Sequence, residues 1–346
     1  MTIILTIASL FAAAIPMLFF LFVVWNLDLY DRKPLWLVGA SFLWGALGAV
    51  LIAIFFQIII DFPVGAIFSP ELAMQISVTF VAPLTEEPAK AFILLLLIRS
   101  RKYGNICDGF IFGAAAGLGF GMTENAKYFI EGAMMSGDSI VGAAAWSQLV
   151  VTRTLFSALM HATASSLVGA AMGFGKFYPR IIRAICASVG MALAMAIHAL
   201  WNGILVTDVS SGEDFLRLAQ RFGVEGPMEP FYLDAILFGI ELLLTLSLFF
   251  LFQIWESRKL HKNLKIEAEN GIIPSEHVPF LASILKRREH GWLDAKIPQK
   301  EYISLSTQLA LRGGQSRMLT DKRKEWYDSD YRRLQQEVRD ILSLDT

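Results

Sequence analysis

Long apolar runs alternate with short polar segments along the chain up to about residue 255. Seven of these runs are long enough to cross a bilayer, since a helical span needs about 20 mostly apolar residues. No basic leader or small-residue cleavage site precedes the first run, so we expect it to be retained as a span. The pattern predicts an all-α polytopic membrane protein with about seven transmembrane helices. They cover residues 3–25, 35–60, 73–98, 109–129, 149–172, 181–206 and 231–254.

The Lys and Arg residues near these spans indicate which loops face the cytoplasm. They collect in every second loop, and cytoplasmic loops carry the excess of such residues. We therefore expect the N-terminus to lie outside and the C-terminal tail to lie in the cytoplasm. The outer loop 207–229 could carry a short surface helix at 215–222. The basic groups are Arg32 and Lys33; Arg99, Arg101 and Lys102; Lys176, Arg180 and Arg183; and Arg258 and Lys259.

The residues after 254 change from apolar to charged. Helices are expected at 275–288 and 299–312, and a third would carry Leu334, Val338 and Ile341 on one stripe. Such a tail is too short to hold a large core by itself. These changes divide the chain into two N-terminal spans (1–72), a four-helix membrane core (73–206), an outer loop with the seventh span (207–255) and a small helical cytoplasmic tail (256–346).

Composition restricts the class of protein further. Hydrophobic residues make up 55% of the chain, and their clustering excludes an ordinary soluble protein. The net charge of −1 says nothing about nucleic acid. Because the basic residues lie next to the membrane spans rather than on one folded face, we expect no nucleic-acid partner. Cys107 and Cys186 both fall near predicted cytoplasmic ends of spans, so we expect neither a structural disulfide nor a cysteine metal site.

Three formal charges interrupt the third apolar run. Glu86, Glu87 and Lys90 lie within one helical turn of each other, and each costs roughly 3 kcal/mol or more at the centre of a membrane helix. One ammonium group can partly compensate both carboxylates at spacings of three and four residues. Such groups usually face a polar cavity with a function. The alternative is a structural ion-pair cluster that joins helices.

The next three spans also carry polar residues at similar depth. Glu124 and Asn125 follow a ridge of glycines at 109, 113, 117 and 121, which allows a neighbouring backbone to come close. His161 has Ser165 one turn further on, and His198 has Asn202. Counted along each span, these groups lie near mid-membrane or towards the outer side. We therefore expect four helices to direct them into one water-filled cavity.

Imidazoles with carboxylates suit two kinds of water activation. They can bind Zn²⁺ with one coordination position open for water. They can also act without a metal, through a buried glutamate that takes a proton from water. In either case a scissile carbonyl needs an oxyanion donor, which Asn202 or a histidine could supply.

Four motifs on successive predicted helices together resemble, in order, those of the PrsW family of intramembrane proteases. That family is related to the superfamily of CAAX prenyl endopeptidases and bacteriocin-processing proteins. The resemblance covers about 73–206 and leaves out the tail and the first two spans. The motifs are Glu86-Glu87-x-x-Lys90, Phe120-x-x-x-Glu124-Asn125, His161-x-x-x-Ser165 and His198-x-x-Trp201-Asn202.

The resemblance implies an intramembrane endopeptidase, generally classed as a metallopeptidase, in the bacterial cytoplasmic membrane. Its expected partner is a single-span membrane protein, with site-1 cleavage of an anti-sigma factor as the associated reaction. Residues 73–206 would then be the catalytic core. Glu86 or Glu87 would be the base, and Asn202 would stabilise the oxyanion. Glu124, His161 and His198 would bind Zn²⁺ or position the water. Lys90 and Asn125 would be further residues of the site.

Two other classes of function fit the same polar residues. A proton or cation transporter also uses chains of Glu and His in its spans, although the paired broken helices typical of transporters are not evident. A non-catalytic membrane scaffold could keep a peptidase-like core. Arg153 could pair with a site glutamate, but we expect it to snorkel to the outer interface instead. The sequence gives no oligomeric state.

Overall fold

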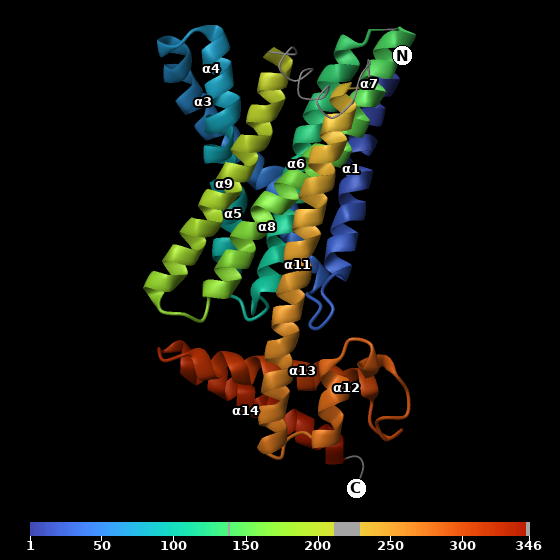
Figure 1. Cartoon of the computed structure of the whole chain (residues 1–346), viewed down its shortest axis with the longest axis vertical. Helices are drawn as coiled ribbons and strands as arrows, with labels where there is room; N and C mark the ends of the chain where they lie inside the picture. Colours follow the sequence, from blue (N-terminus) through green and yellow to red (C-terminus); the bar gives the residue numbers. More distant parts are fainter. Residues whose placement is uncertain (138, 211–228, 344–346) are drawn as a thin grey trace.

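A computed structural model describes residues 1–137, 139–210 and 229–343, and all regular structure in these ranges is helical. The molecule consists of a bundle of long helices and a separate group of shorter helices at one end (Figure 1). The bundle holds α1 Thr2–Asn26, α2 Leu35–Leu43, α3 Val50–Ile67, α4 Pro70–Ile76, α5 Ala82–Leu97, α6 Ile106–Met135, α7 Ile140–Thr152, α8 Ala158–Gly175, α9 Arg180–Ser210 and most of α11 Glu229–Glu269. The predicted surface helix at 215–222 lies outside the described residues.

Six helical segments of the described chain are long and apolar enough to cross a membrane. They coincide with six of the seven predicted runs, which confirms an all-α integral membrane protein. The seventh run, 73–98, forms a continuous helical stretch through α4 and α5 but is not among the six. The reason is its polarity, since Glu86, Glu87 and Lys90 lower the hydropathy of this stretch.

Helix α6 lies at the centre of the bundle. In the most apolar stretch of α6, 89% of the residues are buried, whereas in that of α1 only 17% are. Helices α1, α2, α5 and α8 pack around it. Large apolar side chains of the outer helices point outward, including Phe11 and Phe19 of α1 and Phe55 of α3. This distribution is the reverse of that in a soluble protein and fits a lipid-facing surface.

The glycine ridge of α6 fixes the distance to α8. A Cβ atom built on Gly113 would lie 2.2 Å from the Ser165 carbonyl oxygen, and one on Gly117 would lie 2.1 Å from that of His161. Both distances are far shorter than any van der Waals contact. The predicted close approach of a second backbone is therefore confirmed, and it places His161 directly beside α6.

Three short π-helical turns interrupt the helices around the centre of the bundle. They are η1 Trp44–Ala49, η2 Ser77–Val81 and η3 Arg153–Ser157. Such turns are frequent at functional sites, because they rotate the following residues and release backbone carbonyls. In η2 the Val78 carbonyl accepts a hydrogen bond of 2.9 Å from Asn202 Nδ2 of α9, so a side chain satisfies the released backbone.

The tail forms a compact unit with its own core, which the sequence did not predict. The lower end of α11 contributes Leu260 and Leu264, and these pack against Tyr302, Leu309 and Val338. The predicted helix at 275–288 is wrong in its continuity, since only short turns and α12 Val278–Ala282 form there. The second helix is longer than predicted, because α13 Gln299–Met318 continues through two glycines. The third is α14 Arg323–Leu342.

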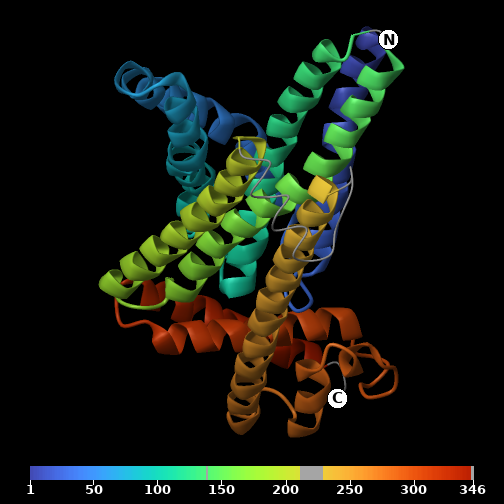
Figure 2. The ribbon, with the colours of Figure 1, turned by 45° about the horizontal axis from the view of Figure 1, so that its top comes forward.

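Polar contacts attach the tail to the loops at the adjacent end of the bundle. Gln315 of α13 donates to the Gly104 carbonyl at 2.9 Å, and Arg323 of α14 donates to the Lys176 carbonyl at 2.9 Å. Lys176 in turn donates to the Ser100 carbonyl at 2.7 Å. The tail therefore lies across the loops that join the core helices (Figure 2). Cys107 and Cys186 are both free, as predicted.

The glycine ridge leads to a matched pair of stability predictions. Gly113→Ala should destabilise the protein by about 1–3 kcal/mol, because the added methyl forces α6 and α8 apart. Gly39→Ala places the same methyl in open space on α2 and should stabilise by up to about 1 kcal/mol. Unfolding of the purified protein in detergent measures both. Equal effects of the two substitutions would contradict the packing described for α6 and α8.

Candidate active site

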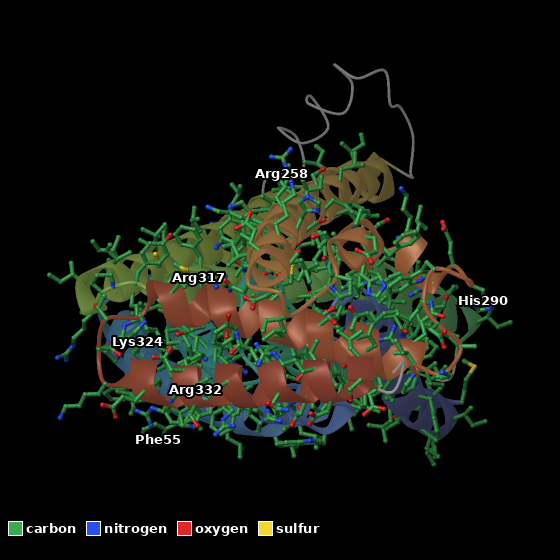
Figure 3. All side chains as sticks on the ribbon, turned by 90° about the horizontal axis from the view of Figure 1, so that it is seen from below. Phe55, Arg258, His290, Arg317, Lys324 and Arg332 are labelled. Carbon is green, nitrogen blue, oxygen red and sulfur yellow. The ribbon has the colours of Figure 1, made fainter. Side chains whose placement is uncertain are left out.

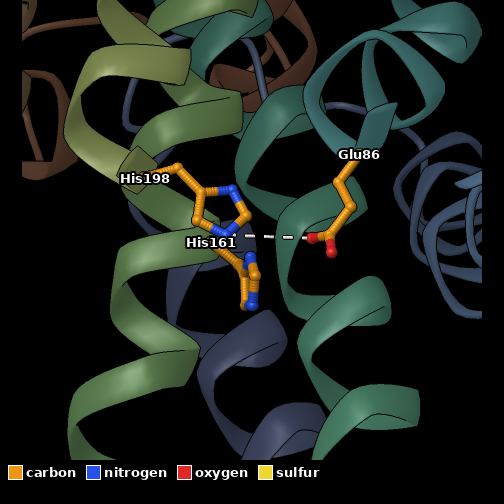
Figure 4. A group of neighbouring side chains, drawn as sticks. All are labelled: Glu86, His161 and His198. Atoms are coloured by element: carbon orange, nitrogen blue, oxygen red, sulfur yellow. Dashed lines mark ion pairs between the residues drawn. The ribbon is translucent and has the colours of Figure 1, made fainter. Parts of the chain in front are cut away.

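Four helices bring the predicted charged and imidazole side chains together inside the bundle. Glu86, Glu87 and Lys90 come from α5, and they meet Glu124 of α6, His161 of α8 and His198 of α9. The two imidazoles cross edge to face with ring centroids 5.0 Å apart, and Glu86 points towards them (Figure 4). The predicted convergence of these side chains is therefore observed.

Glu87 has hydrogen-bond partners on both of its carboxylate oxygens. Its carboxylate is fully buried. Oε1 lies 2.5 Å from Lys90 Nζ and 2.7 Å from His198 Nδ1. Oε2 accepts a longer bond of 3.5 Å from the Ser165 hydroxyl. Both carboxylate oxygens are therefore engaged by protein groups, and Glu87 holds other residues in place.

Lys90 connects the two glutamates of α5 to His161 of α8. Its amine is fully buried, lies 3.9 Å from Glu86 Oε2 and faces the Phe120 ring at 4.6 Å. It also lies 3.1 Å from His161 Nδ1. An ammonium group only donates, so His161 Nδ1 accepts and its Nε2–H is left to donate to a carboxylate. One lysine thus contacts both glutamates of α5, as its spacing predicts, and fixes the tautomer of one histidine.

That carboxylate belongs to Glu124, which Arg153 also contacts. Glu124 Oε2 lies 2.6 Å from His161 Nε2 and 3.1 Å from Arg153 Nη2. Arg153 Nε donates to Asn125 Oδ1 at 3.1 Å, and its guanidinium lies over the Tyr128 ring. The expectation that Arg153 snorkels away from the site is therefore wrong. Arg153 is the first residue of the π-helical turn η3.

Glu86 differs from Glu87 in having one carboxylate oxygen without a hydrogen bond. Oε1 accepts from Gln57 Nε2 of α3 at 3.1 Å, whereas buried Oε2 has no hydrogen-bond partner. Oε2 faces His198 Nε2 at 3.9 Å. Sequence reasoning missed Gln57, although a lone amide inside the apolar second run was a usable signal.

Asn202 and Asn125 lie at the margin of the cluster. The Asn202 amide nitrogen donates to the backbone of η2, so one of its two N–H groups is occupied there. Asn125 is fully buried, and its amide nitrogen has no partner while its oxygen accepts from Arg153. Neither amide contacts Glu86 or Glu87 through an observed hydrogen bond, so their predicted catalytic roles stay predictions.

Three side chains offer a set of ligand atoms for a metal ion. One ligand atom from each of Glu86, His161 and His198 lies within 4.8 Å of the others. This set contains Glu86, whereas the family resemblance implies Glu124 with the two histidines. In the structure Glu124 binds His161 Nε2 and Glu87 binds His198 Nδ1. The nitrogens that remain for a metal ion are His198 Nε2 and His161 Nδ1, and Lys90 contacts the latter. Carboxylates orient metal-binding histidines in this way.

The donor types and the unsatisfied Glu86 Oε2 fit a divalent cation. The Lys90 amine lies against one of the three donors, His161 Nδ1, so it competes with a metal ion for that nitrogen. The cluster therefore combines a carboxylate oxygen with free lone pairs, two oriented imidazoles and a positive charge. Such an arrangement can hold water and accept its proton, or bind a metal ion.

Comparisons with known proteins agree with this site. A protein-family profile described as PrsW family intramembrane metalloprotease matches residues 33–224. Protease PrsW of Clostridioides difficile (strain 630) is 37% identical over 121 residues, or 34% of this chain. This alignment covers 49% of that protein, so the chain spans about half the length of this curated relative. No solved structure matches the chain. Because the family match covers more than half of the chain and includes every member of the cluster, the protein belongs to the PrsW family of intramembrane metalloproteases.

Proposed function

We propose that this protein is an intramembrane endopeptidase that hydrolyses a peptide bond in or near a transmembrane segment. One observation carries the proposal: Glu86 presents a buried oxygen without a hydrogen bond towards two oriented histidines in an otherwise apolar bundle. An unsatisfied buried carboxylate oxygen costs free energy, so it is usually retained for a ligand or a reaction. Family membership supports peptide hydrolysis as that reaction.

Glu86 is our candidate for the residue that activates water. Its Oε2 can hold a water molecule and take the proton when oxygen attacks the scissile carbonyl. Its Oε1 is held by Gln57, which orients the carboxylate. Glu87 is less suited to this role, because Lys90, His198 and Ser165 occupy both of its oxygens. The sequence left the choice between Glu86 and Glu87 open, and the hydrogen bonding supports our proposal of Glu86.

The surrounding residues would position the reacting groups. Glu87 holds His198 through Nδ1, so Nε2 faces Glu86 with its lone pair. Lys90 supplies a positive charge beside the carboxylates, which limits their repulsion in a low-dielectric site. The negative charge that develops on the substrate carbonyl needs a donor, and the second N–H of Asn202 is our candidate.

As the alternative use of the same Glu86 oxygen, we propose that Glu86, His161 and His198 hold a divalent metal ion, with Zn²⁺ as the best match to these donors. Such an ion supplies a Lewis acid and lowers the pKa of its bound water. Glu124 and Glu87 would then keep the two imidazoles in the required orientation. Lys90 would have to leave His161 Nδ1 to free that nitrogen.

The substrate we propose is a single-span membrane protein that reaches the site from the lipid. An apolar groove of about 300 Å³ lies between α3 and α5, and its lining includes Phe56, Leu84, Pro88 and Thr85, the residue before Glu86. Helices α3 and α4 stand apart from the rest of the bundle at this side (Figure 1). The family resemblance suggests an anti-sigma factor in a bacterial cytoplasmic membrane. The basic loops favour an outer N-terminus and a cytoplasmic tail.

Substitution of Glu86 tests the proposed reaction. Cells that express Glu86→Gln should lose the new N-termini of membrane proteins seen with the wild type, with a decrease of at least about 10²-fold. Mass spectrometry of N-termini measures this change. Glu131→Gln removes an exposed carboxylate further along α6 and should leave the termini unchanged. Undiminished termini with Glu86→Gln would exclude Glu86 as the base, and identical profiles with and without the protein would favour a transporter or scaffold.

Metal analysis tests the second part of the proposal independently of activity. The purified wild type should contain about one divalent ion per chain, because the site has one set of three donors. His198→Ala should lower that content at least about tenfold, since one of three ligands is lost. His290→Ala in the tail is the matched control and should keep the ion. Equal metal content in both variants would refute metal binding at this cluster.

A further inference from the structure

A cavity lies where the tail meets the bundle, and its lining shares no residue with the candidate active site. Its volume is about 380 Å³. The start of α6, the end of α8, the lower part of α11 and α13 form its walls. None of its lining residues belongs to the candidate active site. The cavity is therefore a separate feature of the fold and needs its own explanation.

The cavity lies at the boundary between the membrane and the tail. Trp255 of α11 marks the end of the apolar run of this helix, and the charged tail sequence begins directly after it. Phe174 at the end of α8 packs against Trp255 with ring centroids 5.9 Å apart. Aromatic residues gather at the headgroup level of membranes. A lipid headgroup would thus be found at the height of this cavity.

Basic side chains form one part of the lining. They are Lys259 and Lys262 of α11 and Arg317 of α13. Lys259 is held over the Trp255 ring at 3.3 Å, and Arg317 is held by Asn263 at 2.9 Å. Figure 3 shows Arg317 on α13 at the tail side of the molecule.

The acidic residues at this cavity only partly cancel its positive charge. Glu256 also lines the cavity, but it is buried and accepts a bond of 3.2 Å from the Cys107 backbone N–H. Arg317 lies 3.5 Å from buried Glu267, whose two carboxylate oxygens share the single O–H donor of Tyr331 at 3.0 and 2.7 Å. Two lysines therefore remain beside one carboxylate that is already engaged, so the lining favours an anion.

Apolar side chains form the remaining part of the lining. Ile106, Phe174, Ile266 and Leu311 are among them. A small hydrophilic anion would leave this surface without a partner. A molecule with both a negative headgroup and hydrocarbon chains would contact both parts of the lining.

We propose that this cavity binds an anionic phospholipid from the leaflet adjacent to the tail. The phosphate would lie near Lys259, Lys262 and Arg317, and the upper parts of the acyl chains would lie along Phe174 and Ile266. The walls come from both the bundle and the tail, so the lipid would also stabilise the contact between them. This site does not depend on the proposed peptidase reaction.

Lipid retention tests the proposal. The full-length protein is reconstituted in nanodiscs of equal parts phosphatidylglycerol and phosphatidylcholine and then extracted in mild detergent. Native mass spectrometry counts the lipids that stay bound. We expect the wild type to retain phosphatidylglycerol, and the double variant Lys259→Gln, Lys262→Gln to retain at least fivefold less. The control is Arg258→Gln, Lys265→Gln, which removes two exposed charges of the same helix that do not line the cavity.

The position of Arg258 makes this control informative, since it points away from the tail helices (Figure 3). Equal losses in the two double variants, or equal retention of phosphatidylcholine, would overturn the proposal.

Ile266→Trp fills the cavity without changing charge and should also reduce retention at least threefold. Unchanged retention in that variant would overturn the site as well. Inorganic phosphate should not raise the melting temperature as phosphatidylglycerol does, and an equal rise would indicate a free-anion site instead.

Discussion

The ion pair between Glu87 and Lys90 is the constraint on which the central part of this structure depends. Both groups are fully buried and lie 2.5 Å apart in an otherwise apolar bundle. Charges in such surroundings are tolerated only when they are paired and hydrogen-bonded. The pair extends to His198 through Glu87 and to His161 through Lys90, so three helices must keep one relative position. Glu124 and Arg153 complete the network at the side of α6.

This network requires helices that approach closely, and the small residues of α6 permit it. The backbone of α8 lies against the glycines of α6, so His161 projects into the centre from a fixed position. Two π-helical turns lie at Arg153 and directly before α5, and such turns are frequent at functional sites. Packing thus determines where each polar side chain lies, and polar contacts determine which rotation of each helix is stable. The one oxygen of Glu86 that this network leaves without a hydrogen bond is where we place the chemistry.

Much of this arrangement could be predicted from the sequence, because it follows from spacing along single helices. The apolar runs predicted the helices of the bundle, and the four motifs predicted the members of the cluster. Contacts between helices could not be predicted in the same way. The pairing of Arg153 with Glu124, the bond from Gln57 to Glu86 and the grouping of Glu86 with the histidines all depend on helix rotation. The core of the tail was missed for a similar reason, since α11 contributes residues from beyond the membrane run.

Hydrolysis by an activated water is the central claim, and incorporation of oxygen from water tests it most directly. The purified protein is reconstituted in vesicles with the membrane-protein fraction of its own cells, in water enriched in ¹⁸O. Peptide hydrolysis places one oxygen of the attacking water in each new C-terminal carboxylate. We predict new C-termini in or beside transmembrane segments that carry one ¹⁸O atom with the wild type and are absent with the Glu86→Gln, Glu87→Gln double variant. Unlabelled termini, or labelled termini produced equally by the double variant, would contradict the account.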